Sequence, residues 1–440
     1  MKKIKDVLAF FKIPSLLEEE VFDVEDHSKK IKKGMIFIAI GKGNQYRDEA
    51  LKNGASLILS DQEIPSLKKD LLPFLLWFFD YPDKDVSLIG VTGTNGKSST
   101  AYFIFQLLKD GFLISNVPLK EKSTYLIKNT TPYPVSLVHA LLKAKKMGKK
   151  QVILEVSSIA IKEERCGGLL LNICVFTNLS EDHLDYHHTK EEYQKTKLQY
   201  FKNQPAIRFA SLEMQQFETL KDVPVIYVPP LIEDKKGRLI VKEEHPISFS
   251  HFPNYQKNNL ALAIMVAHYF NVSSWHIRCL SHKIKSLNGR YKKVLDHPTV
   301  MIDYAHTVTA MIAVLKEAKK HTKGRLLVVF GAGGDRDKMK RVLYGDAVYN
   351  YSDIAIVTND NPRSEDPMVI VHQIIAHHPT FFYIELDRKR AIERILNLAE
   401  KNDMVLLLGK GHEITEKVND YEIYINEEEE VRKWQKKKKF

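Results

Sequence analysis

The 440-residue chain has few cysteines and no long apolar run. Its three cysteines, Cys166, Cys174 and Cys279, show neither a metal-binding nor a disulfide spacing, which is typical of a protein kept in a reducing cytoplasm. The longest apolar stretches, residues 71–79 and 404–408, are much shorter than the roughly 18 residues that span a bilayer. The basic N-terminus lacks a long apolar stretch and a small-residue cleavage site. We therefore expect a soluble, cytoplasmic protein that is not inserted in a membrane.

The sequence also lacks a nucleic-acid-binding module, although its formal net charge is +11. The basic residues are spread along the chain among acidic ones. The basic run at residues 436–439 comes shortly after the acidic run at residues 427–430, and we interpret it as a solvated tail. A lysine-rich composition and an anionic substrate explain the charge, so we expect no nucleic-acid partner.

The length corresponds to roughly three domains at about 150 residues each. Near the N-terminus, residues 33–40 read as a buried strand, and residues 50–54 read as a helix end that enters a strand at 55–59. The polar, proline-bearing stretch 80–85 is typical of a linker. We predict a small α/β domain over residues 1–85.

Strands and helices alternate from residue 86. An apolar strand at 86–91 is followed by a glycine-rich turn and a helix at 98–109, and residues 151–155 and 172–176 are further short apolar runs that end in polar residues. This pattern predicts a parallel sheet with functional groups at the carboxyl ends of its strands. The short β runs within 225–247 indicate an antiparallel edge.

A second alternating block begins near residue 289. Its predicted strands are residues 300–303, 326–330, 353–357, 381–384 and 404–408, and its predicted helices are residues 308–320, 338–350 and 387–401. The pattern indicates an independent α/β unit with βαβ connections. We predict α/β domains over residues 1–85, 86–288 and 289–440, with no internal repeat.

The turn after the strand at 86–91 has the chemistry of a phosphate-binding loop. Residues 91–99 read VTGTNGKSS. Glycines let backbone N–H groups surround phosphate, Lys97 can reach the β- and γ-phosphates, and the Ser98 hydroxyl can bind Mg²⁺. The strict GxxxxGK[ST] pattern fails because Val91 stands at its first glycine. An ordinary strand–helix turn is the alternative, and the flanking strand and helix disfavour it.

The string GTNGKS after an apolar strand resembles the ATP loop of the Mur ligase and folylpolyglutamate synthase superfamily. The resemblance implies a small N-terminal α/β UDP-binding domain, a central P-loop ATPase-like domain with a mostly parallel sheet, and a C-terminal Rossmann-like α/β domain. It also implies that ATP is bound by seven residues of the loop: Gly93, Thr94, Asn95, Gly96, Lys97, Ser98 and Ser99.

Three further motifs are similar to the family's metal site. Glu155 begins EVSS, and His183 lies in TNLSEDHLDY at 177–186. Lys197 ends Y-x-x-x-K, the position that is carbamylated in the family, and Lys195 is the competing candidate. The resemblance implies that Ser98, Glu155, His183 and carbamylated Lys197 hold Mg²⁺. Two metal ions that hold a γ-phosphate and an acceptor carboxylate need several negatively charged oxygen ligands, and carbamylation would make the lysine such a ligand.

Four residues outside the loop match nucleotide-binding positions of the family. Asp303 and His306 belong to a DYAH string, and Arg290 belongs to the GR pair at 289–290. Lys292 replaces the glutamate of that GRxE motif. Asn259 is the second asparagine of an NxxN element whose first position is Gln256. The resemblance implies that Asn259, Arg290, Asp303 and His306 contact ATP.

The string TNDNPRSEDP at 358–367 separates branches of the family. Its DNPR is similar to the signature of synthetases that add meso-diaminopimelate, and lysine-adding relatives lack the arginine. An arginine can pair bidentately with the distal carboxylate of meso-diaminopimelate. Together with GAGGDRD…KR at 331–341 and LGKGHE at 408–413, the resemblance implies an amino-acid pocket formed by Arg341, Asp360, Asn361, Pro362, Arg363, Gly409 and Glu413.

The resemblance further implies a site for the UDP-linked substrate. The segment HSK at 27–29 aligns with the family's DSR, and Asn129-Thr130-Thr131-Pro132 resembles its NTTP element. The family usually follows EVSS with histidine, where this chain has Ile159. The implied substrate-binding residues are Ser28, Lys29, Asn129, Thr130, Thr131, Ser157 and Arg165.

The implied activity is ATP-dependent addition of meso-diaminopimelate to UDP-MurNAc-L-Ala-D-Glu through an acyl-phosphate, by a monomer with Lys97, Lys197, His183 and Glu155 as its catalytic residues. This reaction belongs to peptidoglycan precursor synthesis and so to cell-wall biogenesis, cell shape and cell division. The DNPR string disfavours two sister activities, the lysine-adding synthetase and folylpolyglutamate synthase. A degenerate homologue that binds nucleotide without ligase activity is the alternative suggested by Ile159, Lys292 and the altered HSK segment, and the intact catalytic residues disfavour it.

Overall fold

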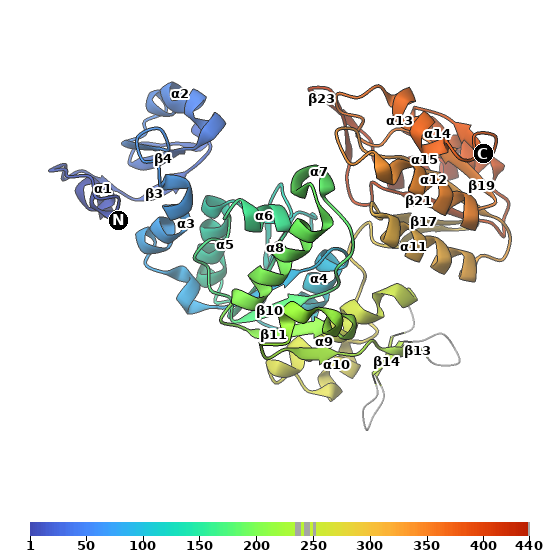
Figure 1. The fold of residues 1–440 in the computed structure, drawn as a ribbon, viewed down its shortest axis with the longest axis horizontal. Coiled ribbons are helices and arrows are strands. Elements are labelled where there is room, and N and C mark those ends of the chain that lie inside the picture. The colour runs from blue at the N-terminus through green and yellow to red at the C-terminus, as the bar shows by residue number, and fades with distance from the viewer. Residues whose placement is uncertain (234–238, 242–246, 250–251, 439–440) are drawn as a thin grey trace.

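The computed structural model describes residues 1–233, 239–241, 247–249 and 252–438. Three α/β units follow one another along the chain, and Figure 1 shows them side by side, with the N-terminal unit at one end and the C-terminal unit at the other. Among the described residues, no sheet contains strands from both sides of the β5–β6 connection or from both sides of the β15–β16 connection. The predicted boundaries at residues 85 and 288 fall within those two connections.

The N-terminal unit is small. Its elements are β1 (Lys2–Lys3), α1 (Ile4–Phe10), β2 (Glu20–Val21), β3 (Asp23–Glu25), β4 (Met35–Ala39), α2 (Arg47–Lys52), β5 (Leu57–Ser60) and α3 (Leu67–Phe78). Strands β3, β4 and β5 form a parallel sheet, and β1 pairs with β2. Helix α3 buries most of its apolar side chains in a core that it shares with the central unit. Burial against this neighbour therefore attaches the first unit to the second.

The central unit contains the phosphate loop. Its elements are β6 (Ser87–Thr92), α4 (Lys97–Leu107), β7 (Gly111–Ser115), β8 (Thr124–Leu126), α5 (Pro134–Lys146), β9 (Gln151–Glu155), α6 (Ser158–Lys162), β10 (Ile173–Phe176), α7 (Leu184–His187), α8 (Lys190–Asn203), β11 (Ile207–Ser211), β12 (Ile226–Val228), β13 (Ile232–Glu233), β14 (Leu239–Val241), β15 (Ile247–Phe249), α9 (Lys257–Tyr269) and α10 (Ser274–Leu280). Seven strands pair in parallel in the order β12-β11-β10-β6-β9-β7-β8.

Alternate residues of β6 explain why helices cover both faces of this sheet. Ile89 and Val91 pack with α4 and α9, whereas Leu88 packs with α5 on the other face. The strand is buried on both sides and is therefore continuously apolar, as parallel strands usually are. The carboxyl ends of β6, β9 and β10 lie together, which brings the phosphate loop, Glu155 and the 177–186 segment to one edge.

The expected antiparallel edge within 225–247 requires a correction. Strand β12 extends the central sheet in parallel, and the antiparallel pairing belongs to a separate sheet formed by β13, β14 and β15. Residues 234–238 and 242–246 of that prediction lie outside the described residues. A short β run in the sequence predicts an extended backbone, but it does not predict which strand that segment pairs with.

The C-terminal unit has the predicted alternation. Its elements are β16 (Lys292–Asp296), β17 (Thr299–Asp303), α11 (Val308–His321), β18 (Leu326–Phe330), α12 (Met339–Tyr351), β19 (Ile354–Val357), α13 (Pro367–Ile375), β20 (Phe382–Ile384), α14 (Arg388–Leu398), β21 (Met404–Leu408), β22 (Thr415–Val418), β23 (Tyr421–Tyr424) and α15 (Glu427–Lys437). The sheet order is β16-β17-β21-β18-β19-β20, and only β16 pairs antiparallel. Helices α11, α12 and α13 cover one face, and α14 and α15 cover the other.

The basic run at residues 436–439 is solvent-exposed over its described part, as expected, but residues 436 and 437 are helical and do not form a tail. Residues 436 and 437 belong to helix α15, which buries Val431 and Trp434 against α14. Its acidic first turn and basic last turn both complement the helix dipole. The charge run is therefore the polar end of an amphipathic helix. No helix in the described part of the chain is long and apolar enough to cross a membrane.

Candidate active site

The phosphate loop connects β6 to α4 and depends on two glycines. Gly93 and Gly96 have φ angles of 138° and 83°, a region that favours glycine. A Cβ at Gly93 would lie 2.0 Å from Thr177 Oγ1, and a Cβ at Gly96 would lie 2.3 Å from Asn259 Oδ1. The predicted nucleotide residue Asn259 therefore lies directly against the loop.

Lys97 is the first residue of α4 and lies folded back over the loop. Its Nζ donates to the carbonyl oxygens of Gly93 at 3.1 Å and Thr94 at 2.8 Å. Burial lowers the pKa of Lys97, and the nearby carboxylate of Glu155 opposes that shift. The ammonium therefore lies among the loop's carbonyl groups, where a phosphate would give it a stronger partner.

Ser98 and Glu155 form the oxygen pair of the predicted metal site. Ser98 Oγ donates to Glu155 Oε2 at 2.8 Å, and burial raises the pKa of this carboxyl while Lys97 opposes the shift. His183 is the N-cap residue that precedes α7 and has a φ of 53°, and burial lowers its pKa to about 4 against the opposing effect of Asp182. No group of three or more His, Cys, Asp or Glu side chains could hold a metal ion by itself among the described residues.

The structure separates the two lysines that compete for the Y-x-x-x-K role. Both lie on α8, but Lys197 is 1% exposed, whereas Lys195 is exposed. Lys197 Nζ donates to Gly93 O at 2.7 Å, so its amine lies against the phosphate loop. Burial and the neighbouring Lys97 place the pKa of Lys197 well below its ordinary value. Only Lys197 is therefore close to Lys97 and the loop.

Asp182 is a site residue that the sequence reasoning did not single out. It is buried and accepts from Lys340 Nζ at 2.8 Å, which joins the central unit to the C-terminal unit. Burial opposes its ionisation, but His183, His306 and Lys340 together lower its pKa. The signal was present, because Asp182 stands inside the same TNLSEDHLDY string as His183.

A cavity of about 270 Å³ lies between the central and C-terminal units. Seven of the residues predicted to bind ATP line it, namely Asn95, Gly96, Ser99, Asn259, Arg290, Asp303 and His306. Gln256, which replaces an asparagine of the NxxN element, also lines it, and its Oε1 is buried without a partner in the described structure. Polar groups from both units therefore converge on one enclosed space of the kind that binds small ligands.

The hinge segment that begins at Gly289 shapes one wall of this cavity. Arg290 stacks its guanidinium 4.4 Å from the ring centre of Tyr304, and Asp303 Oδ2 accepts from the backbone N–H of Tyr291 at 2.6 Å. Lys292, which stands where the family has glutamate, pairs with Glu428 of α15 at 2.5 Å. The positive charge of Lys292 is therefore balanced by an acidic residue of this chain.

Opposite charges gather around the DNPR segment. Asn361 Nδ2 donates to Glu413 Oε2 at 3.2 Å, and the fully buried Lys410 Nζ lies 3.7 Å from both Asp360 and Glu413. Lys410 was not among the predicted pocket residues, although it belongs to the LGKGHE string. Gly409 has a φ of 106°, and a Cβ there would lie 2.2 Å from Asp360 Oδ2. The predicted residues Asp360, Asn361, Gly409 and Glu413 therefore come together.

Arg363 is half-buried beside this cluster and has a φ of 53°. Its Nη1 donates to Gly334 O, and its backbone is held by Lys417 O at 3.0 Å and Asn419 N at 2.7 Å in the β22–β23 hairpin. Burial and the nearby Arg336 lower its pKa. The preceding Pro362 is buried. The hairpin therefore fixes the backbone from which the guanidinium extends.

Arg341 does not face the pocket as the sequence reasoning expected. It is 1% exposed, its Nη1 and Nη2 both donate to Glu365 at 2.8 Å, and Nη1 also donates to Gln373. Nη2 also donates to Gly333 O at 3.0 Å. The side chain therefore supports the loop behind Arg363. Both terminal nitrogens of Arg341 are therefore occupied within the protein, whereas its buried Nε has no hydrogen-bond partner in the described structure.

The predicted UDP-substrate residues fall into two places. Thr131, Ser157 and Arg165 come together, since Ser157 N donates to Thr131 Oγ1 at 2.9 Å and Arg165 Nη1 donates to Thr131 O at 3.4 Å. The exposed Asn129 and the half-buried Thr130 directly precede them. In the N-terminal unit, Ser28 Oγ donates to Glu49 at 2.5 Å and Lys29 is exposed.

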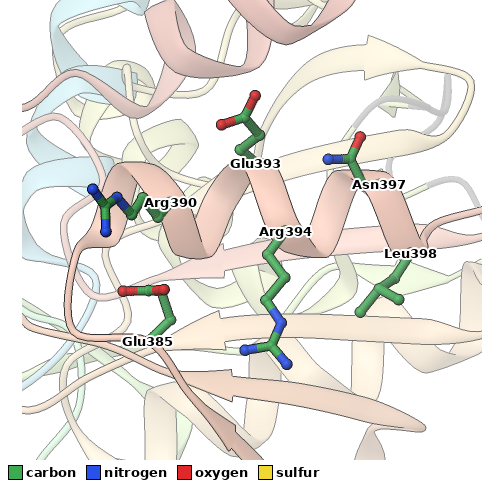
Figure 2. A pocket seen from close by; sticks show the side chains of 6 residues that line it. All are labelled: Glu385, Arg390, Glu393, Arg394, Asn397 and Leu398. Carbon is green, nitrogen blue, oxygen red and sulfur yellow. The ribbon is translucent and has the colours of Figure 1, made fainter.

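A second hollow, of about 360 Å³, lies along α14 and contains none of the predicted residues. Figure 2 shows Arg390, Glu393, Arg394, Asn397 and Leu398 arranged along this helix, with Glu385 on the segment before it. Arg394 stacks 4.8 Å from the ring centre of Tyr383. None of the side chains predicted from sequence motifs therefore lines this hollow.

Known proteins resemble this chain along most of its length. Residues 91–223 match the Mur ligase middle domain, and residues 289–411 match the Mur ligase glutamate ligase domain. The UDP-N-acetylmuramoyl-L-alanyl-D-glutamate–2,6-diaminopimelate ligase of Aquifex aeolicus is 32% identical over 91% of this chain and 90% of its own. The protein of the same name from Oceanobacillus iheyensis is 30% identical over 94% of each chain.

Solved structures agree with this likeness. A structure of a UDP-N-acetylmuramoyl-L-alanyl-D-glutamate–2,6-diaminopimelate ligase has a TM-score of 0.64 at 25% identity and covers 100% of this chain and 99% of its own. The MurF ligase from Thermotoga maritima in complex with ADP has a TM-score of 0.66 at 19% identity, over 88% and 93% of the two chains.

The phosphate loop and the cavity between two α/β units define an ATP-dependent enzyme of three domains. The chain belongs to the Mur ligase family, whose members are ATP-dependent ligases that form an amide bond.

Proposed function

We propose that this protein adds meso-diaminopimelate to the D-Glu γ-carboxylate of UDP-MurNAc-L-Ala-D-Glu, in the synthesis of peptidoglycan precursors in the cytoplasm. The names of its relatives from Aquifex aeolicus and Oceanobacillus iheyensis support this substrate pair. The observation that carries the proposal is the arrangement around Arg363, which extends beside Asp360, Asn361 and Glu413.

The charges of this cluster match the distal end of meso-diaminopimelate, which carries an ammonium and a carboxylate on one carbon. The Arg363 guanidinium would donate hydrogen bonds to the carboxylate, and Asp360 and Glu413 would accept hydrogen bonds from the ammonium. L-lysine has the ammonium but lacks the carboxylate, so it would leave the guanidinium without a partner. The folylpolyglutamate synthase alternative is supported by likeness of fold alone.

In the first step, an oxygen of the D-Glu γ-carboxylate attacks the γ-phosphorus of ATP, and the bond from phosphorus to the bridging oxygen of ADP breaks. Lys97 and Arg290 would neutralise charge on the phosphates. This role depends on the position of the two side chains, which form no covalent bond to the substrate. The amine of the amino acid then attacks the acyl carbon, phosphate leaves, and the amine loses a proton. The amide bond is thus formed at the expense of ATP.

The residues present fit a Mg²⁺ ion, because the buried Glu155 carboxylate already lies against the Ser98 hydroxyl next to the loop. Mg²⁺ is commonly held by one or two carboxylates together with substrate phosphates and waters. We propose Ser98, Glu155, His183 and Lys197 as its holders, with Lys197 carrying a CO₂ adduct. In that reaction the amine nitrogen bonds to CO₂, a proton is released, and the chain gains a carboxylate. When bound, the metal would offset negative charge on the phosphates.

The N-terminal unit and the neighbouring edge of the central unit would bind the UDP-linked substrate. Thr131, Ser157 and Arg165 would contact the peptide part, and Ser28 with Lys29 would contact the diphosphate. We propose that the enzyme acts as a monomer and binds no nucleic acid.

The test is the initial rate of phosphate release from ATP in the presence of UDP-MurNAc-L-Ala-D-Glu. Separate reactions contain meso-diaminopimelate, L-lysine or no amino acid, and the product is identified by mass. We expect rapid release with meso-diaminopimelate and slow release with L-lysine. Equal release in all three reactions would support a nucleotide hydrolase without ligase activity and would overturn the proposal.

A further inference from the structure

The buried ion pair between Arg388 and Glu427 lies directly behind the amino-acid pocket. We propose that this pair is the positioning element that sets the spacing of the pocket's two loops, so that helix α15 takes part in amino-acid recognition. This inference rests on the proposed function for the location of the pocket.

Arg388 begins α14, and its side chain is fully buried. Its Nη1 donates to Asn359 O at 3.1 Å, and its Nη2 donates to Leu408 O at 2.6 Å. Asn359 lies just after the end of β19, and Leu408 is the last residue of β21. Strand β18 separates these two strands in the sheet. One planar guanidinium therefore bridges two strand ends across the strand that lies between them.

The residue after each of these carbonyls belongs to the pocket. Asn359 precedes Asp360, and Leu408 precedes Gly409. The close approach of a Cβ at Gly409 to Asp360 Oδ2, 2.2 Å, shows that the two loops already touch. A small shift of either carbonyl would therefore move Asp360 relative to Glu413. Such displacements have large effects on reactions that depend on positioning.

Glu427 is the first residue of α15 and fixes the orientation of the guanidinium. Its Oε1 accepts from Arg388 Nε at 2.8 Å and lies 2.7 Å from Nη2, and both side chains are almost inaccessible. Helix α15 is anchored by the burial of Val431 and Trp434, and Trp434 Nε1 donates to Asn397 Oδ1 at 2.9 Å on α14. The family match ends at residue 411, so this anchor lies beyond it.

An arginine suits this role because its donors lie in one rigid plane. Glu427 uses Nε and Nη2, which leaves Nη1 directed at the first loop and the second hydrogen of Nη2 directed at the other. A lysine keeps the charge but offers a single ammonium that cannot reproduce this fork. Other segments line the cavity proposed to bind ATP, so the affinity for ATP should not depend on the Arg388–Glu427 pair.

The test compares Glu427→Gln and Arg388→Lys with the control Asp403→Asn. Asp403 pairs with Arg325 at 2.7 Å at the amino end of β21, the opposite end from Leu408. For the two pocket variants we expect the KM for meso-diaminopimelate to rise by about ten- to a hundredfold, with the KM for ATP unchanged. For the control we expect a lower melting temperature and an unchanged KM for the amino acid.

A KM for the amino acid equal to that of the wild type in both pocket variants would overturn the inference. So would an equal rise in the KM for ATP, or the same rise in the control. Glu427→Asp keeps the charge at a shorter reach and serves as the second variant if the others fail to fold, and an unchanged KM in this variant would also overturn the inference. Should wild-type protein use L-lysine instead, the proposed substrate is wrong, and the same comparison is made with L-lysine.

Discussion

Removal of the Arg363 guanidinium should separate amino-acid recognition from ATP binding. In Arg363→Ala the backbone remains held by Lys417 and Asn419 of the hairpin, and the pocket keeps Asp360 and Glu413. Only the fork for the distal carboxylate is lost, together with its bond to Gly334 O. We therefore expect the fold to persist and the selectivity for meso-diaminopimelate to fall.

The magnitude follows from the partial burial of the side chain. Loss of one partner of a charged hydrogen-bonded pair costs about 1.5–3 kcal/mol. Because Arg363 is only half-buried, we expect the lower part of that range. Since about 1.4 kcal/mol is a factor of ten, kcat/KM for meso-diaminopimelate should fall roughly 10- to 40-fold. Arg363→Lys should recover little of this loss, because an ammonium cannot form the bidentate pair.

The assay is phosphate release at varied concentrations of meso-diaminopimelate, L-lysine and ATP. The matched control is Lys417→Ala, which removes an exposed positive charge from the neighbouring hairpin and leaves the backbone contacts in place. The control should behave as the wild type. If Arg363→Ala leaves the ratio of kcat/KM for the two amino acids unchanged, the role assigned to Arg363 is refuted.

Three further predictions concern the loop, the lysines and the pH response. Gly96→Ala should abolish the thermal stabilisation by ADP, because a Cβ would lie 2.3 Å from a neighbouring side chain, whereas Gly148→Ala, at a φ of 64° with open space, should keep it. Lys197→Ala should lose activity and regain part of it with formate, and Lys195→Ala should stay active; a CO₂ adduct on Lys195 in a crystal structure would contradict the assignment. Burial lowers the pKa of His412 to about 3, so the folded state binds fewer protons than the unfolded state below pH 6.5 and loses stability as the pH falls. At pH 5 the free energy of unfolding should be about 2 kcal/mol lower than at neutral pH because of this histidine. His412→Gln should remove that part of the pH dependence when the free energy of unfolding in urea is measured at pH 7 and at pH 5.

The sequence could predict the elements because each strand that carries a motif is apolar on both faces and ends in polar residues. The strand before the phosphate loop, the strand that ends at Glu155 and the strand before Asp360 are confirmed for this reason. The seven residues predicted to bind ATP that line the interdomain cavity come from segments far apart along the chain, and the resemblance of their motifs to those of the family pointed to them.

Tertiary contacts decided what the sequence could not. The residue types alone did not distinguish Lys195 from Lys197, and only the family spacing favoured Lys197. Burial on α8 now separates the two lysines. Arg341 matched a motif, but its guanidinium is engaged by Glu365 and a loop carbonyl. The acidic and basic runs near the C-terminus are the two ends of an amphipathic helix, and its buried residues Val431 and Trp434 lie between the two runs.

The central claim is that ATP activates a carboxylate as an acyl-phosphate, and the fate of the carboxylate oxygen tests it most directly. UDP-MurNAc-L-Ala-D-Glu labelled with ¹⁸O in the γ-carboxylate is converted with ATP and meso-diaminopimelate, and the released phosphate is examined by mass spectrometry. The attacking oxygen becomes the bridge to phosphorus and leaves with it, so we predict one ¹⁸O atom in each phosphate formed. Phosphate that carries no ¹⁸O would show that water attacks ATP and would contradict the account.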